Sequence, residues 1–161
     1  VKPNNAAVFA THLYTQQFQE VLKVLVKHKI DFSRRFVDGN EVLGYLIAKG
    51  GAGADFCAGL DTLIANGADI HATYNGKPLL YLLVESGGAS RRPGGSYAEE
   101  VMQTFDALVA KGLDPYAPYG EFANVFDYAE SKTTSSNRIH TRASEALLPL
   151  LTEWKEKHPK M

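Results

Sequence analysis

Residues 60–72 read LDTLIANGADIHA, and they contain the clearest structural pattern in the sequence. Its first apolar residues, Leu60, Leu63 and Ile64, fall at i, i+3 and i+4, which places them on one face of a helix. A glycine follows, and glycine at this position is typical of a helix that ends in the left-handed backbone conformation. Asp69 comes six positions after Leu63, where a short polar side chain favours a turn. The stretch therefore predicts a helix end followed by a polar turn.

The same pattern occurs in two further places, each with the aspartate six positions after the middle apolar residue. A fourth segment keeps the apolar triplet but has Trp154 where the glycine stands elsewhere, and it continues into a charged tail. We interpret this last copy as a terminal cap. The further triplets are Leu22, Leu25 and Val26 before Ile30-Asp31; Phe105, Leu108 and Val109 before Gly112-Leu113-Asp114-Pro115; and Leu147, Leu150 and Leu151 in the cap.

A second, shorter apolar segment follows each polar turn, and we interpret each one as a short buried helix. The turns themselves contain glycine, and Asn75-Gly76 is a dipeptide typical of a hairpin tip. The sequence thus predicts turns that project from the helices. The expected short helices are 42–46, 79–83 and 125–129, with a less regular counterpart at 8–10, and the polar stretches run from Asp31 to Gly39, Asp69 to Gly76 and Asp114 to Gly120.

The order turn, short helix, connector and longer helix resembles the ankyrin repeat. That family has the pattern G-x-T-P-L-H-x-A in its first helix and V-x-x-L-L-x-x-G-A-D at its second. Residues 67–72 are the closest match, residues 126–129 resemble a variant of the first-helix motif, and residues 113–117 resemble a second copy of the capping turn. The resemblance covers residues 4–154. No copy retains the full T-P-L-H, whose threonine and histidine normally brace the turn by hydrogen bonds.

This resemblance implies an all-α fold, an ankyrin-type solenoid of about four helix-turn-helix repeats with projecting turns. We expect a single domain over residues 1–161, with repeats at approximately 4–36, 37–74, 75–119 and 120–157. The middle apolar anchors are 38, 45 and 42 residues apart, against about 33 in a standard ankyrin unit. We place the extra residues in the connectors between paired helices, because a stack tolerates insertions only where they do not interrupt it. These connectors are expected at 50–54, 86–96 and 131–141.

The net charge of the chain does not indicate any class of binding partner. Seventeen basic and eighteen acidic residues leave a formal charge of -1, so no net field draws the protein to nucleic acid or to an anionic membrane. The longest apolar runs are far shorter than the roughly 20 residues that a membrane span needs. We therefore expect no nucleic-acid partner and no membrane span. The chain begins at Val1, which leaves its location open between the cytoplasm and, if the N-terminus is processed, the periplasm.

Motifs for metals and cofactors are missing from the sequence. The five histidines do not have the H-E-x-x-H spacing, and a single cysteine cannot build a thiolate zinc site. The glycine-rich residues 50–53 lack the G-K-[ST] ending that holds phosphate and magnesium in a P-loop. We therefore expect no metal, no cofactor and no enzymatic activity.

Three alternative functions remain open from the residues alone. A small helical hydrolase would use Cys57 as a nucleophile beside a histidine, or a set of aspartates and histidines such as Asp69 and His71. We interpret Cys57 instead as a small buried hydrophobe and the repeated aspartates as acceptors of turn amides. A phosphate or nucleic-acid binder would use Arg34-Arg35 and Arg91-Arg92. A self-associating structural protein is the third.

The resemblance implies a non-catalytic module that binds another protein on an extended surface of turns and short helices. Tyrosines in projecting turns suit such contacts, because a ring offers a large area at little rotamer cost. With no catalytic domain beside the repeats, one specific expectation is an inhibitor that neutralises a toxin or effector enzyme, as bacterial immunity and antitoxin proteins do. The expected contact residues are Arg34, Arg35, Phe36, Asp38, Asn40, Tyr45, His71, Tyr74, Asn75, Lys77, Tyr81, Tyr116, Tyr119 and Glu121.

Overall fold

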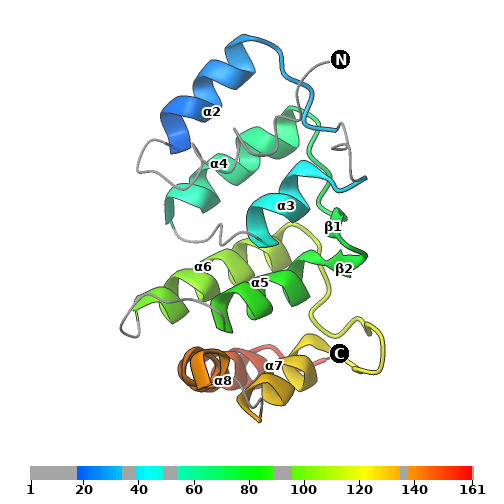
Figure 1. The fold of residues 1–161 in the computed structure, drawn as a ribbon, viewed down its shortest axis with the longest axis vertical. Helices are drawn as coiled ribbons and strands as arrows, with labels where there is room; N and C mark the ends of the chain where they lie inside the picture. Colours follow the sequence, from blue (N-terminus) through cyan, green and yellow to red (C-terminus); the bar gives the residue numbers. More distant parts are fainter. Residues whose placement is uncertain (1–17, 34–38, 49–53, 89–95, 135–137, 161) are drawn as a thin grey trace.

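The computed structural model describes residues 18–33, 39–48, 54–88, 96–134 and 138–160, which are mostly helical (Figure 1). The expected N-terminal segment at 8–10 lies outside these residues. None of the helices in the described ranges combines the length and apolar character that crossing a membrane needs. The elements are α2 (Phe18–Lys27), α3 (Val42–Ala48), α4 (Ala54–Ala65), β1 (Thr73–Tyr74), β2 (Lys77–Pro78), α5 (Leu79–Gly88), α6 (Ser96–Ala110), α7 (Val125–Thr133) and α8 (Arg138–Lys157).

The helices lie in two columns along the long axis of the molecule (Figure 1). In one column α2 packs against α4, α4 against α6 and α6 against α8. In the other column α3 packs against α5 and α5 against α7, while α5 with α6 and α7 with α8 join the two columns. The short helices expected after each turn are confirmed as α3, α5 and α7, and the longer ones carry the apolar triplets. The all-α prediction therefore holds, apart from the short β1–β2 ribbon.

Three of the longer helices end with the same backbone geometry. At the second residue after each helix the backbone φ is positive. The sequence predicts this conformation for the two glycines, and a lysine adopts it in the first copy. In each copy the next amide then donates to the carbonyl of the middle apolar anchor, so a carbonyl orphaned at the helix end is satisfied. The positions are Lys29 (φ 55°), Gly67 (107°) and Gly112 (108°), and the bonds are Ile30 N to Leu25 O (3.1 Å), Ala68 N to Leu63 O (2.9 Å) and Leu113 N to Leu108 O (3.3 Å).

The repeated aspartates brace the turns that follow. Asp31 accepts the amide of Ser33 at 2.9 Å, and Asp69 accepts the amide of His71 at 2.8 Å. Asp114 accepts the amide two residues later in the same way, at 2.9 Å. One side chain thus makes one bond at the same point of three units, which confirms the interpretation of these aspartates as acceptors of turn amides.

The apolar triplets supply the contact between neighbouring helices. Their first members are all buried, with at most 2% of each side chain exposed. Burying a leucine or phenylalanine contributes roughly 1.5–3 kcal/mol, so these positions hold the two columns together. The first members are Leu22, Leu60, Phe105 and Leu147; of the middle members, Leu63 and Leu108 are buried, while Leu25 and Leu150 are partly buried against the core.

Two of the connectors are shorter than predicted because the helices extend into them. α5 continues to Gly88 and α7 to Thr133, inside the segments 86–96 and 131–141 that the sequence predicts as loops. Serine and threonine favour loops by composition, but here their hydroxyls bond to the helix end itself. Ser131 donates to Tyr128 O at 2.6 Å, Thr133 to Glu130 O at 2.7 Å and Thr134 to Ser131 O at 2.9 Å. Residues 49–53, which form most of the first connector, lie outside the described ranges.

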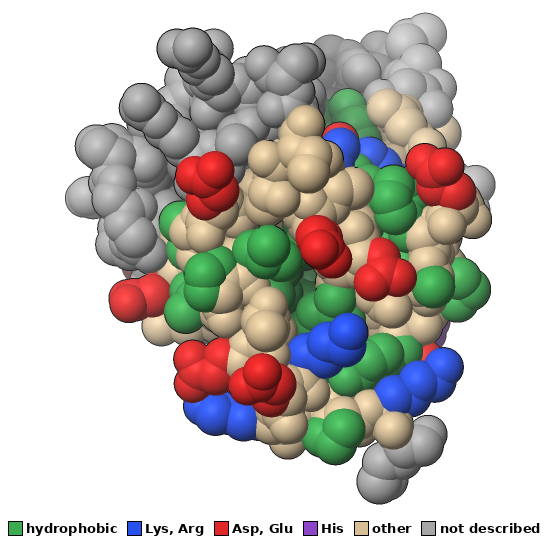
Figure 2. All heavy atoms as spheres, turned by 90° about the horizontal axis from the view of Figure 1, so that it is seen from below, with side chains coloured by type: hydrophobic (Ala, Val, Ile, Leu, Met, Phe, Trp, Pro, Cys, Tyr) green, Lys and Arg blue, Asp and Glu red, His purple; other side chains and the backbone are tan. Residues whose placement is uncertain are grey.

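Helix α8 closes one end of the molecule. Trp154 takes the position that Gly67 and Gly112 have in two of the other copies; it is 9% exposed, and α8 continues past it to Lys157. Its ring meets Phe105 edge-on, with centroids 5.1 Å apart, and its Nε1 donates to Asp106 at 2.7 Å. The outer surface of this end carries acidic, basic and hydrophobic side chains interspersed over one face (Figure 2). Helix α8 is thus packed on its inner side, while the outer surface of this end is mixed in character.

Candidate protein-binding surface

The β1–β2 ribbon is a tight hairpin with Asn75-Gly76 at its tip. Tyr74 pairs with Lys77, and Asn75 and Gly76 have positive φ values of 50° and 81°. Two consecutive left-handed residues form the turn whose twist matches a β-hairpin, and Asn-Gly is its preferred dipeptide. Both tip residues are exposed, so the hairpin predicted from the sequence is confirmed and projects from the helices.

The hairpin is tied to the unit before it, both at its tip and at its base. Asn75 N donates to Asn40 Oδ1 at 2.8 Å, and Asn40 Nδ2 donates back to Asn75 Oδ1 at 3.1 Å. Glu41 Oε2 accepts the amide of Thr73 at 3.1 Å. Asn40 is buried and therefore positions the hairpin from below, whereas Asn75 is the exposed member of the pair.

Two tyrosines lie side by side where the hairpin meets α3. The rings of Tyr45 and Tyr74 meet edge-on, with centroids 6.0 Å apart and an interplanar angle of 62°. Both side chains are half-buried, and Tyr74 packs against the hydrophobic core. One side of the Tyr74 ring is therefore packed, while the rest of the side chain stays accessible.

Lys77 is the centre of a charged cluster that joins the hairpin to α5 and α7. Its Nζ lies 2.6 Å from Glu85 Oε2 and donates to Tyr128 Oη at 3.0 Å. Lys132 reaches the other oxygen of Glu85 at 3.7 Å and lies 4.8 Å from the centroid of the Tyr128 ring. Two lysines thus share one carboxylate above an aromatic ring, on side chains that remain partly exposed.

The ion pair changes the pKa values of both partners. Burial alone would raise the pKa of Glu85, but the hydrogen bond and charge of Lys77 and the charge of Lys132 lower it below its ordinary value of 4.5. Burial alone would lower the pKa of Lys77, but its hydrogen bonds to Glu85 and Tyr128 raise it above 10.5. Both groups therefore stay charged at neutral pH.

The third turn repeats the hairpin in a shorter form. Tyr119 and Phe122 exchange two backbone hydrogen bonds of 3.0 Å, with Gly120 at φ 58° and Glu121 exposed at the tip. The Phe122 ring meets the Tyr128 ring edge-on at 5.0 Å, which connects this turn to the cluster around Lys77. The hairpin and this turn lie on the same side of the helix columns (Figure 1).

Two of the expected contact residues instead hold the fold together. Tyr81 is 3% exposed, and its hydroxyl donates to Ala117 O at 2.7 Å. Its ring lies against Tyr119, with centroids 5.1 Å apart. Burial, with a smaller effect of the Asp127 charge, raises the pKa of Tyr81 above 10.0. Tyr116 is half-buried and bonds to His158 O at 2.7 Å. We therefore leave both residues out of the candidate surface.

The remaining expected residues divide into exposed and undescribed ones. His71 is exposed, directly before β1, with its backbone amide held by Asp69. Tyr119 is half-buried beneath the third turn, and Glu121 is exposed at its tip. The residues of the first turn, Arg34, Arg35, Phe36 and Asp38, lie outside the described ranges. We call the set that the structure brings together the turn surface: Tyr45, His71, Tyr74, Asn75, Lys77, Glu85, Tyr119, Glu121, Phe122 and Lys132.

Three members of this surface are absent from the sequence-based set. Glu85 directly follows the apolar run 79–84. A carboxylate at the end of a buried segment marks the point where the chain reaches the surface, so the sequence could have indicated this residue. Phe122 and Lys132 have no such signal, because their roles depend on Tyr128, which brings two units together.

The residues that a hydrolase, a metal site or a phosphate binder would need are not brought together in the described part of the chain. Cys57 is half-buried, and its thiol donates to Thr104 Oγ1 at 3.6 Å rather than to a histidine of the described ranges. Within the same ranges no group of three or more histidine, cysteine, aspartate or glutamate side chains is arranged to hold a metal ion. Arg91-Arg92 lies outside the part of the chain that the structure describes.

No family model, curated protein or solved structure matches the chain.

Proposed function

We propose that this protein is a non-catalytic binding module, an ankyrin-type stack of about four units that holds another protein on its turn surface. The repeated helix ends and aspartate bonds support the fold part of the proposal, since three units share them in one register. Contacts between successive helices of each column also support it, since each unit of a solenoid packs on the next.

The single observation that carries the function is the half-buried pair of Tyr45 and Tyr74 beside an exposed, hydrogen-bonded hairpin tip. A rigid aromatic ring with one packed side loses little entropy when a partner covers its other side. The hairpin backbone is held by Asn40 and Glu41, so the surface is formed before a partner arrives.

Polar groups around this pair supply the directional contacts that a protein interface needs. Lys77, Glu85 and Lys132 are partly exposed on one side of the tyrosines, and Glu121 is exposed at the next turn. An aromatic centre with a polar rim is the usual anatomy of a protein interface. Fixed charges of both signs favour a partner with a complementary pattern.

The test is capture of the partner from a lysate of the source cells, followed by affinity measurement with purified variants. The double variant Y74A/Y119A removes the two rings from neighbouring turns, and Y74F/Y119F keeps the rings as the matched control. We expect Y74A/Y119A to weaken binding by about 2 kcal/mol or more, the loss typical of a hot spot, while the phenylalanine variant binds nearly as the parent does.

Equal affinity of Y74A/Y119A and the parent, with both proteins folded by circular dichroism, would contradict the proposal. Inhibition of an enzyme is a further part of the proposal and has its own test. If the captured partner is an enzyme, its activity should fall as the protein is added in equimolar amount, and should not fall with Y74A/Y119A.

A further inference from the structure

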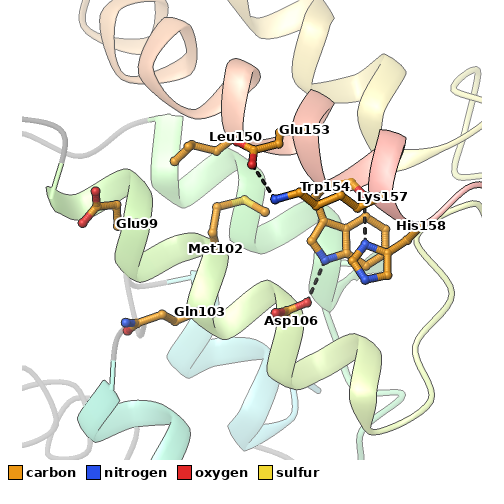
Figure 3. A pocket seen from close by; sticks show the side chains of 9 residues that line it. All are labelled: Glu99, Met102, Gln103, Asp106, Leu150, Glu153, Trp154, Lys157 and His158. Atoms are coloured by element: carbon orange, nitrogen blue, oxygen red, sulfur yellow. Dashed lines mark hydrogen bonds and ion pairs between the residues drawn. The ribbon is translucent and has the colours of Figure 1, made fainter.

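A second surface lies away from the turns, in the groove between α6 and α8 (Figure 3). The groove is open to solvent and has a volume of about 480 Å³. Four of its lining residues come from α6 and the others come from α8 and the residue that follows it. None of them belongs to the turn surface. The lining residues are Glu99, Met102, Gln103, Asp106, Leu150, Glu153, Trp154, Lys157 and His158.

The floor of the groove is apolar. Met102 and Leu150 are half-buried and face each other across the groove, one from each helix (Figure 3). The indole of Trp154 forms the end of the floor, with His158 stacked on it at 4.2 Å between ring centroids. The flexible thioether of a methionine adapts to side chains of different shapes, which suits a binding surface.

The rim of the groove is acidic. Glu99 and Asp106 are exposed on the α6 wall, and Glu153 is exposed on the α8 wall. Asp106 accepts Trp154 Nε1 with one carboxylate oxygen, and Lys157 pairs with Glu153 at 2.5 Å. Three carboxylates against one lysine leave the rim with an excess of negative charge around an apolar floor.

We propose that this groove binds an amphipathic helix of a partner protein, with apolar side chains on Met102 and Leu150 and with lysine or arginine residues at the acidic rim. A helix with its apolar face in a groove between two helices is a common mode of peptide recognition. The charge of the rim selects a basic helix, because basic side chains meet Glu99, Asp106 and Glu153, whereas an acidic helix would be repelled. This site is independent of the turn surface, so the protein has two interfaces on different elements.

The chain provides its own probe for this groove, because Trp154 is its single tryptophan. A 14-residue helical peptide of leucine and lysine, amphipathic in pattern, is titrated into the full chain while the tryptophan emission is followed. We expect a saturable change in emission with the leucine–lysine peptide and none with a leucine–glutamate peptide of the same pattern. Binding should weaken as salt increases, since the rim charges are exposed.

Variants separate the groove from general charge attraction. E99Q/E153Q removes two rim charges, and E20Q/E130Q removes two exposed charges from α2 and α7 as the matched control. We expect a loss of affinity of at least fivefold for E99Q/E153Q and less than twofold for E20Q/E130Q. M102K places a charge on the floor and should abolish the emission change, with circular dichroism showing that the variant is folded.

Three results would overturn the proposal: no emission change at any peptide concentration, equal binding of the acidic peptide, or equal losses in the two double variants. None of these results depends on the turn surface, because Tyr74 and Tyr119 are unchanged throughout.

Discussion

Asn40 and Asn75 lie 35 residues apart in the chain and are joined by two hydrogen bonds, Asn75 N to Asn40 Oδ1 at 2.8 Å and Asn40 Nδ2 to Asn75 Oδ1 at 3.1 Å. The first residue is buried and the second is at an exposed hairpin tip. A binding element at the surface is thus oriented by a side chain in the interior.

Substitution N40A should therefore destabilise the protein. It removes the acceptor of the Asn75 amide, and the loss of a part-buried hydrogen bond of this kind costs roughly 0.5–1.5 kcal/mol. The matched variant N75G keeps that amide and the left-handed backbone of the tip, so we expect a smaller loss. Denaturant unfolding followed by circular dichroism measures both, and an N40A protein as stable as the parent would contradict this role of Asn40.

Gly44 should not tolerate a side chain, although it lies inside helix α3. A Cβ at this position would come within 2.4 Å of the Thr73 carbonyl oxygen, which is backbone and cannot move aside cheaply. At an open helical position alanine gains about 1 kcal/mol over glycine. Here we expect G44A to lose about 1–3 kcal/mol, the usual cost of overpacking. A stabilised G44A protein in thermal unfolding would show that α3 and β1 are not in this close contact.

Two of the turn aspartates, Asp69 and Asp114, should have comparable effects, because they occupy equivalent positions and make equivalent bonds. D69A and D114A each remove one hydrogen bond to an exposed turn amide, and we expect each to cost about 1 kcal/mol. D31A should cost more, since Asp31 also accepts the hydroxyl of Ser33 at 2.5 Å. Unfolding free energies of the three variants check this, and a large difference between D69A and D114A would contradict the equivalence of the units.

The contribution of Glu85 to stability should disappear in acid. Its pKa in the folded protein is below the ordinary value of 4.5 because of Lys77 and Lys132, despite the opposing effect of burial. The ion pair therefore stabilises the fold above pH 4.5, and this contribution is lost as the pH falls through the lowered pKa. We expect E85Q to be less stable than the parent at pH 7 and equally stable in acid below that pKa.

Unfolding at a series of pH values measures this effect, and E121Q at the exposed turn tip is the control. A difference between the parent and E85Q that is the same at every pH would show that Glu85 acts through packing rather than through its charge.

The elements of the fold could be predicted because their signals are local. An apolar triplet, a residue with positive φ and an aspartate all lie within about ten residues of each other, so residues 60–72 alone predict the end of α4 and the turn after it. The hairpin follows from Asn75-Gly76 for the same reason. The length of α7 was missed because the hydroxyls of Ser131, Thr133 and Thr134 bond within the helix end, which composition does not reveal.

The candidate surface was less predictable because it is formed by contacts between units. Tyr45 and Tyr81 both come from short helices, yet one is half-buried at the surface and the other is buried beneath the third turn. The difference depends on what the next unit places against each ring: the hairpin leaves part of Tyr45 accessible, whereas Tyr119, Tyr128 and Ala117 O enclose Tyr81. Spacing along one unit contains no information about these partners.

Hydrogen exchange of the chain, measured with and without its purified protein partner, would show whether the turn surface is the interface. We expect slower exchange on binding at the amides of residues 71–78 and 119–122, the two described turns of the turn surface. Unchanged exchange in both turns, with protection confined to other parts of the chain, would contradict it.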